Sequence, residues 1–206
     1  MKVLLINGSP HEKGCTYTAL SLIAGELNAQ GIETEILHVG GQPVGGCIGC
    51  GGCRSGNGCV FGGVVNEAIE KAKTADAFVF GSPVHYASAA GNMASFMDRL
   101  AYAGGKYLAY KPAAICCSAR RAGTTSTLDQ LVKYPQFFQM PLVNGSYWAM
   151  VHGSNPEQVL QDAEGCAVMQ ELGRNMAWLL HCIEAGKAAG IDHPQNPPRP
   201  MTSFIR

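Results

Sequence analysis

The chain has 206 residues, 47% of them hydrophobic, and its 15 basic and 15 acidic side chains cancel. A chain of this length predicts one domain with a sizeable buried core. The balanced charge argues against nucleic acid or an anionic membrane surface as the partner and favours a small-molecule ligand. No stretch of the sequence reaches the roughly 20 apolar residues that a membrane-spanning helix needs.

The nine cysteines indicate a reducing compartment. The chain starts with an apolar run that leads directly into Asn7-Gly8-Ser9, without the charged and apolar leader of a secreted protein. An odd number of cysteines also fits poorly with a framework of disulfides. We therefore expect reduced thiols and a cytoplasmic protein.

Predicted strands and helices alternate from the start of the chain. Residues 3–6 form a continuous apolar run, and a helical pattern follows from about residue 16 to residue 31. Residues 33–39 alternate between polar and apolar side chains, which is typical of a second strand. A glycine-rich and cysteine-rich loop spans residues 40–63, and residues 64–72 return to helical spacing.

The same unit then repeats with further buried strands. A third strand is predicted at residues 77–80, ending in Gly81-Ser82-Pro83, and a helix follows near residues 93–100. A fourth strand is predicted at residues 113–117, and the small residues after it lead into another helix. Residues 142–147 supply a fifth candidate strand.

The C-terminal part is predicted to be a long helix and an irregular tail. Asn155-Pro156-Glu157 is typical of a cap and first helical turn. An amphipathic helix is expected from about residue 162 to residue 185. Residues 193–206 contain four prolines and are expected to be irregular.

Five strands that alternate with helices predict an open α/β parallel sheet with helices on both faces. We expect the flavodoxin-like strand order 2-1-3-4-5, because the first loop lacks the G-x-G-x-x-G of a dinucleotide-binding sheet. The predicted flavodoxin-like domain covers residues 1–190, and residues 191–206 form a proline-rich tail. In such sheets ligands bind at the carboxyl ends of the strands, where the loops after strands one, three and four should meet.

A run of four cysteines is the strongest single motif. Cys47, Cys50, Cys53 and Cys59 follow the pattern C-x2-C-x2-C-x5-C in the glycine-rich loop. Glycine lets such a loop turn its sulfurs towards one centre. Three readings stay open from the spacing: a 4Fe-4S cluster, a zinc site, and reduced thiols that hold no metal.

The first loop, residues 7–16, is a candidate phosphate site. Free amides and hydroxyls at the start of a helix bind anions without a cationic side chain, and Ser9 and Thr16 are the candidate donors. The spacing of Gly8 and Gly14 does not match a Walker-type loop, which argues against nucleoside triphosphate hydrolysis. The alternative is a plain turn followed by a helix that Thr16 caps.

Four motifs together resemble the NADPH-dependent FMN reductase family, close to its iron-sulfur flavoprotein branch. They are, in order, Asn7-Gly8-Ser9-Pro10, the cysteine run, Gly81-Ser82-Pro83-Val84 with Tyr86, and Phe96-Met97-Asp98-Arg99. Residues 118–124 and 147–153 extend the resemblance over most of the chain. Each motif alone is weak, whereas the ordered set is specific.

The resemblance implies noncovalently bound FMN with its phosphate in the first loop. By position, the phosphate would be held by Ser9, His11, Cys15 and Thr16, with Tyr17 beside it. The family commonly has arginine at the position of His11 and asparagine at that of Cys15. The phosphate is therefore expected to depend more on backbone amides in this chain.

The resemblance places the isoalloxazine ring between the loops after the third and fourth strands. The expected ring-site residues are Pro83, Val84, His85, Tyr86, Ser118, Ala119, Arg120, Arg121, Gly123 and Thr124. His85 stands where the family usually has tyrosine, and its reading as a structural hydrogen-bonding group is favoured over proton transfer. Paired arginines could stabilise a reduced flavin or an NADPH phosphate, but at least one is expected to be a solvated loop charge.

The expected function is an FMN-dependent oxidoreductase that takes hydride from NAD(P)H and passes electrons to a small-molecule or protein acceptor. No side chain is expected to be catalytic, since the cofactor carries the chemistry. The alternatives are an iron-sulfur flavoprotein that carries electrons without using nicotinamide, and a structural metal module. The resemblance also implies a homodimer or homotetramer. Asp98 and Arg99 are expected to form a structural ion pair, and Cys116 and Cys117 to be buried in a strand end.

Overall fold

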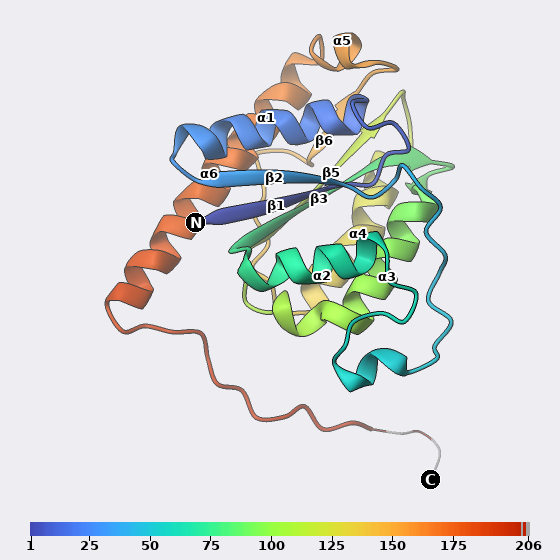
Figure 1. Ribbon diagram of the computed structural model, residues 1–206. Coiled ribbons are helices and arrows are strands. Elements are labelled where there is room, and N and C mark those ends of the chain that lie inside the picture. Colours follow the sequence, from blue (N-terminus) through green and yellow to red (C-terminus); the bar gives the residue numbers. More distant parts are fainter. Residues whose placement is uncertain (203, 205–206) are drawn as a thin grey trace.

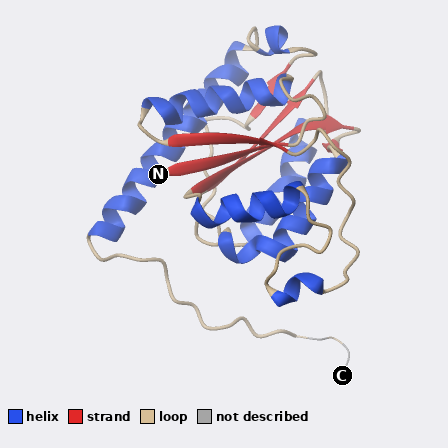
Figure 2. Ribbon diagram, viewed as in Figure 1, coloured by secondary structure: helices blue, strands red, loops and turns tan. Residues whose placement is uncertain are grey.

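Five parallel strands form the centre of the computed structural model, which describes residues 1–202 and 204. Figure 1 shows the sheet between two layers of helices, and Figure 2 separates strands from helices by colour. The order across the sheet is β2-β1-β3-β5-β6. The strands are β1 (Lys2–Asn7), β2 (Glu33–His38), β3 (Ala77–His85), β5 (Ala113–Ala119) and β6 (Met150–His152).

The two faces of the sheet bury separate hydrophobic cores. Helices α1 (Cys15–Ala29) and α6 (Ala163–Ala188) cover one face. The other face carries α2 (Val64–Thr74), α3 (Gly91–Gly104) and α4 (Thr124–Phe137). The short elements are β4 (Ser88–Ala89), α5 (Pro156–Val159) and the 3₁₀ helices Gly52–Ser55 and Gly105–Tyr107.

Strand β3 illustrates how the sequence supplies both cores. Val79 packs towards α1 and α6, whereas Phe78 and Phe80 pack on the opposite face, because successive side chains of a strand alternate. Phe78, Val79 and Phe80 have no exposed surface. Burying one such side chain stabilises the fold by about 1.5–3 kcal/mol.

The architecture confirms the predicted flavodoxin-like class and the order of the five principal strands. The predicted helix starts are also confirmed. Asn155 Oδ1 accepts a hydrogen bond from Gln158 N at 2.9 Å, and Asp162 Oδ1 accepts one from Gly165 N at 3.0 Å. Both side chains satisfy amides that the first helical turn leaves free.

The third strand is longer than predicted, and the sheet has six strands instead of five. Gly81-Ser82-Pro83 was expected to end this strand, but β3 continues to His85 and turns back into the antiparallel strand β4. Proline is tolerated here because β1 ends opposite Gly81, and proline suits a strand that has lost a neighbour. The Ser82 hydroxyl accepts a bond from Ala90 N at 3.0 Å and so ties the returning strand down.

The fifth strand was predicted at residues 142–147, and this prediction is wrong. The segment touches the sheet only at an isolated bridge between Leu142 and Ala113, and the strand β6 starts at Met150. Helix α6 holds the intervening backbone away from the sheet. Glu171 accepts a bond from Ser146 N at 2.6 Å, and Asn175 donates to the Asn144 carbonyl at 2.8 Å.

The C-terminal helix ends near the predicted start of the tail. Helix α6 ends at Ala188, and residues 191–202 contain neither helix nor strand. Residues 203, 205 and 206 of the predicted tail lie outside the described residues. The division at residue 190 stays a prediction. None of the described helices is long and apolar enough to cross a membrane.

Candidate FMN site and cysteine pocket

The loop between β1 and α1 is folded on itself by its own polar groups. The Asn7 side chain accepts a bond from Ser9 N at 3.1 Å and donates to the Glu12 carbonyl at 2.9 Å. The Ser9 hydroxyl accepts a bond from His11 N at 3.1 Å. Asn7 and Ser9 are buried, and His11 is exposed at the loop surface. Among the described residues, the Ser9 hydroxyl proton has no acceptor, so it can donate to a ligand.

The start of α1 is suited to an anion. The N-cap residue is Gly14, and no side chain among the described residues caps the helix. The first turn contains no acidic residue, so the helix dipole there is not compensated. The first turn of an α-helix leaves its N–H groups without intrahelical partners. In α1 these are the amides of Cys15, Thr16 and Tyr17. This arrangement is typical of a phosphate site.

Two of the predicted phosphate residues turn towards the sheet. The Thr16 hydroxyl is buried and lies 2.9 Å from the Ser118 hydroxyl, so Thr16 does not cap its own helix, whose N-cap is Gly14. The Cys15 thiol donates to the Gly153 carbonyl at 3.5 Å. Burial raises the pKa of Cys15, which favours the neutral thiol.

Two glycines allow close packing around this loop. A Cβ on Gly8 would lie 2.7 Å from the Met93 sulfur, and a Cβ on Gly40 would lie 2.1 Å from the Ser9 carbonyl oxygen. The His38 ring also contacts the Ser9 carbonyl at 2.8 Å. The end of β2 therefore fixes the loop from behind.

The predicted ring-site residues Pro83 to Tyr86 lie on the β3–β4 hairpin. Val84 pairs with Ala89 and His85 with Ser88, which leaves Tyr86 and Ala87 at the tip. The tip residues have φ angles of 49° and 57°, a left-handed backbone that costs energy for residues other than glycine. His85 and Tyr86 are exposed, and Pro83 and Val84 are half-buried.

Helix α4 holds this hairpin in place. The Gln130 side-chain oxygen accepts bonds from the Ser88 hydroxyl at 2.7 Å and from Ala89 N at 2.9 Å. Ser126 donates to the Ala87 carbonyl at 2.7 Å. Gln130 and Ser126 were not among the predicted residues, because no motif marks a side chain that acts on a distant hairpin.

The loop after β5 carries the last group of predicted residues. Ser118, Ala119 and Thr124 are buried, whereas Arg120 and Arg121 are exposed. No ion pair among the described residues involves either arginine. Gly123 has a φ of 97°, and a Cβ there would lie 2.7 Å from Ala87, so this glycine lets the loop touch the hairpin.

Direct contacts join the three loops at one edge of the sheet. Gly8 N donates to the Gly81 carbonyl at 2.9 Å, and the pair Thr16–Ser118 joins the first loop to the third. All fifteen predicted cofactor-binding residues therefore lie in the loops after β1, β3 and β5 or in the strand and helix ends that flank these loops. This is the edge at which ligands of parallel sheets bind.

The four cysteines of the motif line one pocket of about 270 Å³. Cys47 and Cys50 are exposed, and Cys53 and Cys59 are half-buried. Among the described residues, no three His, Cys, Asp or Glu side chains lie close enough together to hold a metal ion. Four soft thiol ligands in one pocket nevertheless fit the chemistry of a thiolate-bound metal group, provided that the loop draws its sulfurs together.

Side chains of α2 and α3 anchor the cysteine loop. Asn66 accepts a bond from Cys59 N at 2.8 Å and donates to the Cys59 carbonyl at 3.0 Å. Asn92 donates to the carbonyls of Gly40 and Gln42 and accepts from Val44 N. The sequence offered no signal for either asparagine. The anchors fix both ends of the loop and leave its middle more open.

The expected ion pair between Asp98 and Arg99 is absent from the described residues. Asp98 instead accepts a bond from the Tyr134 hydroxyl at 2.6 Å. Burial, followed by this bond to Asp98, raises the pKa of Tyr134 above its usual range. Neighbours in a helix point in different directions, which explains why the two side chains find separate partners.

Arg99 reaches the cysteine loop. Its Nε donates to Cys59 Sγ at 3.2 Å, and its other nitrogens donate to the carbonyls of Gly62 at 3.0 Å and Gly45 at 3.4 Å. The side chain of Phe61 lies over the guanidinium, with 5.4 Å between the ring centre and Cζ. Arg99 is only 6% exposed, and no described carboxylate pairs with it. A buried cation of this kind favours an anionic partner in the cysteine pocket.

The fold and the three loops together define an FMN-binding flavodoxin-like protein. The chain belongs to the NADPH-dependent FMN reductase family, whose profile matches residues 1–155. The match contains all three loops and the cysteine run, so it covers the whole candidate site.

Several proteins with similar sequences are iron-sulfur flavoproteins. One from Methanocaldococcus jannaschii is 27% identical over 192 residues, which is 89% of this chain and 100% of the relative. One from Methanosarcina thermophila is 22% identical over 192 residues, covering 91% of this chain and 99% of the relative.

Solved structures share the fold at lower identity. RosB with a bound 8-demethyl-8-formylriboflavin-5'-phosphate intermediate has a TM-score of 0.71 at 13% identity, covering 100% of this chain and 96% of RosB. The apo form of the NADH:FMN oxidoreductase EmoB has a TM-score of 0.64 at 17% identity, covering 86% and 89%.

Proposed function

We propose that this protein is an FMN-dependent oxidoreductase that takes hydride from NAD(P)H and passes electrons to a separate acceptor. The observation that carries the proposal is the convergence of the loops after β1, β3 and β5 at one edge of the sheet. Membership of the FMN reductase family supports the same conclusion. Bound FMN would supply the hydride-accepting and electron-releasing chemistry.

The phosphate of FMN is proposed to bind at the start of α1. The free amides of this turn and the Ser9 hydroxyl would donate to it, and the buried Thr16–Ser118 pair would shape the floor. His11 at the exposed rim would add a donor. Cys15 and Tyr17 would contribute their amides, because the Cys15 thiol is already bonded to Gly153.

The flavin ring is proposed to lie between the β3–β4 hairpin and residues 118–124. The rigid backbone at Pro83 and Val84 would face one edge of the ring, and the amides of Gly123 and Thr124 the polar edge. Tyr86 at the hairpin tip would pack against the ring or the nicotinamide. Arg120 and Arg121 have no carboxylate partner among the described residues and are free to bind a nucleotide phosphate.

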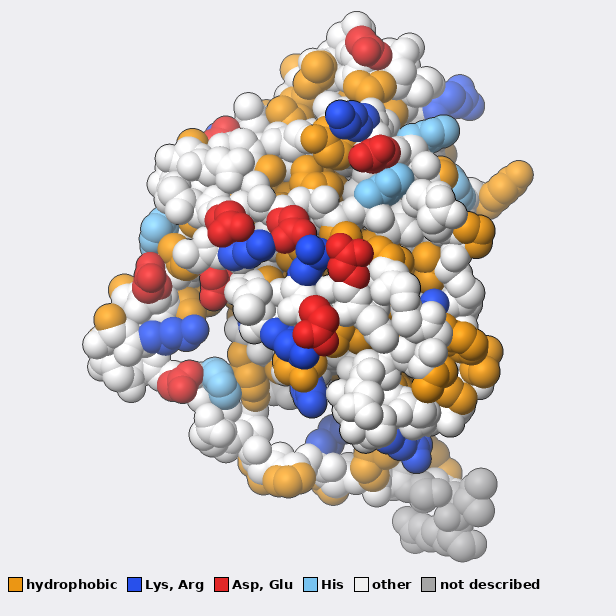
Figure 3. Space-filling view, viewed as in Figure 1, with side chains coloured by type: hydrophobic (Ala, Val, Ile, Leu, Met, Phe, Trp, Pro, Cys, Tyr) orange, Lys and Arg blue, Asp and Glu red, His pale blue; other side chains and the backbone are white. Residues whose placement is uncertain are grey.

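We further propose that Cys47, Cys50, Cys53 and Cys59 hold a 4Fe-4S cluster. The shared pocket, the names of the relatives and the buried charge of Arg99 support this. Figure 3 shows hydrophobic side chains gathered along the right-hand edge of the molecule. Exposed Ile48, Val60 and Phe61 lie on the cysteine loop itself and would suit contact with a protein acceptor or a second subunit.

Anaerobic titration tests the nicotinamide step. Protein reconstituted with FMN is mixed with NADPH or NADH, and the visible absorbance of the flavin is followed. The proposal predicts that at least one nucleotide bleaches the flavin. If dithionite bleaches the bound flavin but neither nucleotide does, the protein is an electron carrier that uses no nicotinamide.

Replacing both arginines sharpens this experiment. The variant R120Q/R121Q should need a higher NADPH concentration for half-maximal reduction, with FMN affinity changed less. The surface variant R174Q removes a guanidinium that pairs with Glu26 at 3.0 Å on the α1–α6 side, and it serves as the matched control. Equal behaviour of all three proteins would show that the arginines are solvated charges.

A further inference from the structure

The outer edge of strand β5 has a gap in its hydrogen bonding. At one end of the strand, Ala113 N donates to the Pro141 carbonyl, and the Ala113 carbonyl accepts a bond from Val143 N. At the other end, Cys117 N donates to the Ala149 carbonyl. Alternate residues of a strand present their N–H and C=O groups to the same neighbour, so Ile115 faces this edge as well. No hydrogen bond among the described residues joins Ile115 to residues 142–149.

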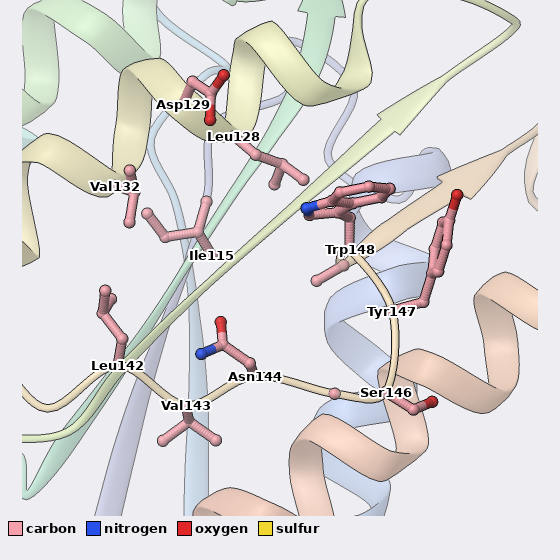
Figure 4. Close-up of a pocket in the computed structure, with 12 residues that line it drawn as sticks. Ile115, Leu128, Asp129, Val132, Leu142, Val143, Asn144, Ser146, Tyr147 and Trp148 are labelled. Carbon is pink, nitrogen blue, oxygen red and sulfur yellow. The ribbon is translucent and has the colours of Figure 1, made fainter.

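A pocket of about 490 Å³ lies in this gap (Figure 4). Its volume is within the usual range for small-molecule sites, roughly 300–1,000 Å³. Apolar side chains from β5, α4 and the departing loop line it, including Ile115, Leu128, Val132 and Leu142. It shares no residue with the three FMN loops or with the cysteine pocket, so it is a separate cavity.

The pocket contains polar groups without protein partners. Ile115 is 8% exposed, and a buried backbone N–H and C=O that make no bond are unfavourable unless water or a ligand supplies one. The side chains of Asn144 and Asp129 also line the cavity, and neither makes a hydrogen bond among the described residues. The backbone of Ile115 therefore offers one donor and one acceptor to an otherwise apolar space, whereas the Asn144 and Asp129 side chains lie at its solvent-exposed rim.

An aromatic wall closes the pocket on one side. The rings of Tyr147 and Trp148 meet edge to face, with centroids 4.8 Å apart and an interplanar angle of 72°. Trp148 remains 59% exposed, so one large surface of the indole is available for stacking. Figure 4 shows the Trp148 ring standing beside the cavity, near Leu128.

We propose that this edge pocket binds a planar heteroaromatic ligand that has a hydrogen-bond donor next to an acceptor, as in a lactam or an aromatic carboxamide. The donor and acceptor pair with the backbone C=O and N–H of Ile115, as a neighbouring strand would. The ring stacks on Trp148, and Asp129 favours a ligand with a further donor or a positive charge at the rim. The ligand completes the sheet edge that residues 144–148 leave open.

The test uses the FMN-loaded protein and the bicyclic lactam 2-quinolone. Backbone amide NMR should show saturable shifts at Ile115 and at the Trp148 indole N–H. N-methyl-2-quinolone keeps the ring but lacks the donor, and it should bind at least tenfold more weakly. W148L should also weaken binding at least tenfold, while W178F, which replaces the other tryptophan of the chain at an exposed position on α6, should not.

Two outcomes would overturn the proposal. One is the absence of saturable shifts with 2-quinolone, which would leave water as the partner of Ile115. The other is equal affinity for 2-quinolone and its N-methyl derivative, which would show that the backbone pair takes no part. Should W148L fold poorly, the comparison of the two ligands on the unaltered protein still decides.

Discussion

Arg99 Nε lies 3.2 Å from Cys59 Sγ, and this contact joins helix α3 to the cysteine pocket. The guanidinium is buried, and its other donors go to backbone carbonyls instead of carboxylates. Its positive charge is therefore balanced by no described acidic side chain. A thiolate-bound cluster carries negative charge, and a buried cation at one of its sulfurs stabilises the reduced form most.

Replacing Arg99 by glutamine should lower the reduction potential of the proposed cluster. The expected shift is roughly 60 mV, the equivalent of a tenfold change in a one-electron equilibrium. A redox titration followed by electron paramagnetic resonance measures the potential, and iron and sulfide analysis measures cluster content. The lysine variant should recover part of the potential, because it keeps the charge without the planar donors.

Arg54 provides the control for this prediction. It also lines the cysteine pocket but is exposed to solvent, so R54Q should change the potential much less. Equal potentials for R99Q and unaltered protein, at full iron content, would contradict the role of Arg99. If the unaltered protein contains no iron after reconstitution, the proposal of a cluster is itself contradicted.

A methyl group at Gly40 should weaken FMN binding. The Cβ of G40A would lie 2.1 Å from the Ser9 carbonyl oxygen, so the backbone of the phosphate loop has to move. We expect FMN affinity to fall at least tenfold, which corresponds to about 1.4 kcal/mol. Quenching of flavin fluorescence during titration measures the affinity.

Gly25 is the matched site for the same substitution. A Cβ at Gly25 would meet no atom of the described residues within 4 Å, and Gly25 lies inside α1. G25A should bind FMN normally and gain roughly 0.5–1 kcal/mol of unfolding free energy. Unchanged FMN affinity in G40A would mean that the first loop is not the phosphate site.

The buried cysteines of β5 should resist alkylation in the folded protein. Burial raises the pKa of Cys117 to about 12 and that of Cys116 still further, so neither forms the reactive thiolate near neutral pH. Cys47 and Cys50 are exposed and should react in metal-free protein. Peptide mapping by mass spectrometry after iodoacetamide treatment measures each site.

Two further conditions extend the labelling experiment. Unfolding in denaturant should expose all nine cysteines, which controls for detection of the peptides. Reconstitution with iron and sulfide should protect Cys47, Cys50, Cys53 and Cys59 together. Rapid labelling of Cys116 in the folded protein would be incompatible with its burial. If Cys47 is still labelled after reconstitution while Cys53 and Cys59 are protected, Cys47 is not a ligand of the cluster.

The ion-pair network at the β2 edge should make stability depend on pH. Lys2 lies 2.8 Å from Glu35, Lys71 lies 2.6 Å from it, and Figure 3 shows acidic and basic side chains alternating over this region. Hydrogen bonds from Lys2 and then Lys71 lower the pKa of Glu35. A lowered carboxyl pKa stabilises the fold above the unfolded pKa of about 4.3, and that contribution is lost as the pH falls through the folded value.

Replacing Glu35 by glutamine should therefore cost about 1 kcal/mol or less at neutral pH and nearly nothing in acid. Denaturant unfolding at several pH values measures the difference. Glu70 is the control, because its carboxylate is more exposed and Lys73 is its one ion-pair partner in the described part of the chain. E70Q should have the smaller effect. A difference between E35Q and unaltered protein that stays constant into acid would contradict the assigned network.

Much of the sheet could be predicted because apolar runs such as residues 3–6 and 77–80 coincide with strands buried on both faces. The length of the third strand was underestimated because a proline such as Pro83 is typical of a strand end. In the structure β3 continues past the end of β1. The fifth strand was misplaced because residues 142–147 begin with the apolar pair Leu142-Val143. Their backbone is held by Glu171 and Asn175, and such long-range contacts leave no local pattern.

The candidate site divides in the same way. Its glycine, serine and cysteine motifs are local in sequence, so the three loops and the cysteine run could be found before the structure. The residues that position them could not. Gln130 acts on a hairpin more than 40 residues away, and Arg99 acts on Cys59 at a separation of 40 residues. The sequence pattern identified Arg99 but assigned it to Asp98, its neighbour in the chain.

The most direct test follows electrons after NADPH is mixed anaerobically with protein that holds both FMN and the reconstituted iron-sulfur group. Rapid freezing and electron paramagnetic resonance record the flavin and the cluster together at successive times. We predict that the flavin is reduced first and that a signal of the reduced cluster follows. A flavin that stays oxidised, or a cluster that stays oxidised beside a fully reduced flavin, would contradict it.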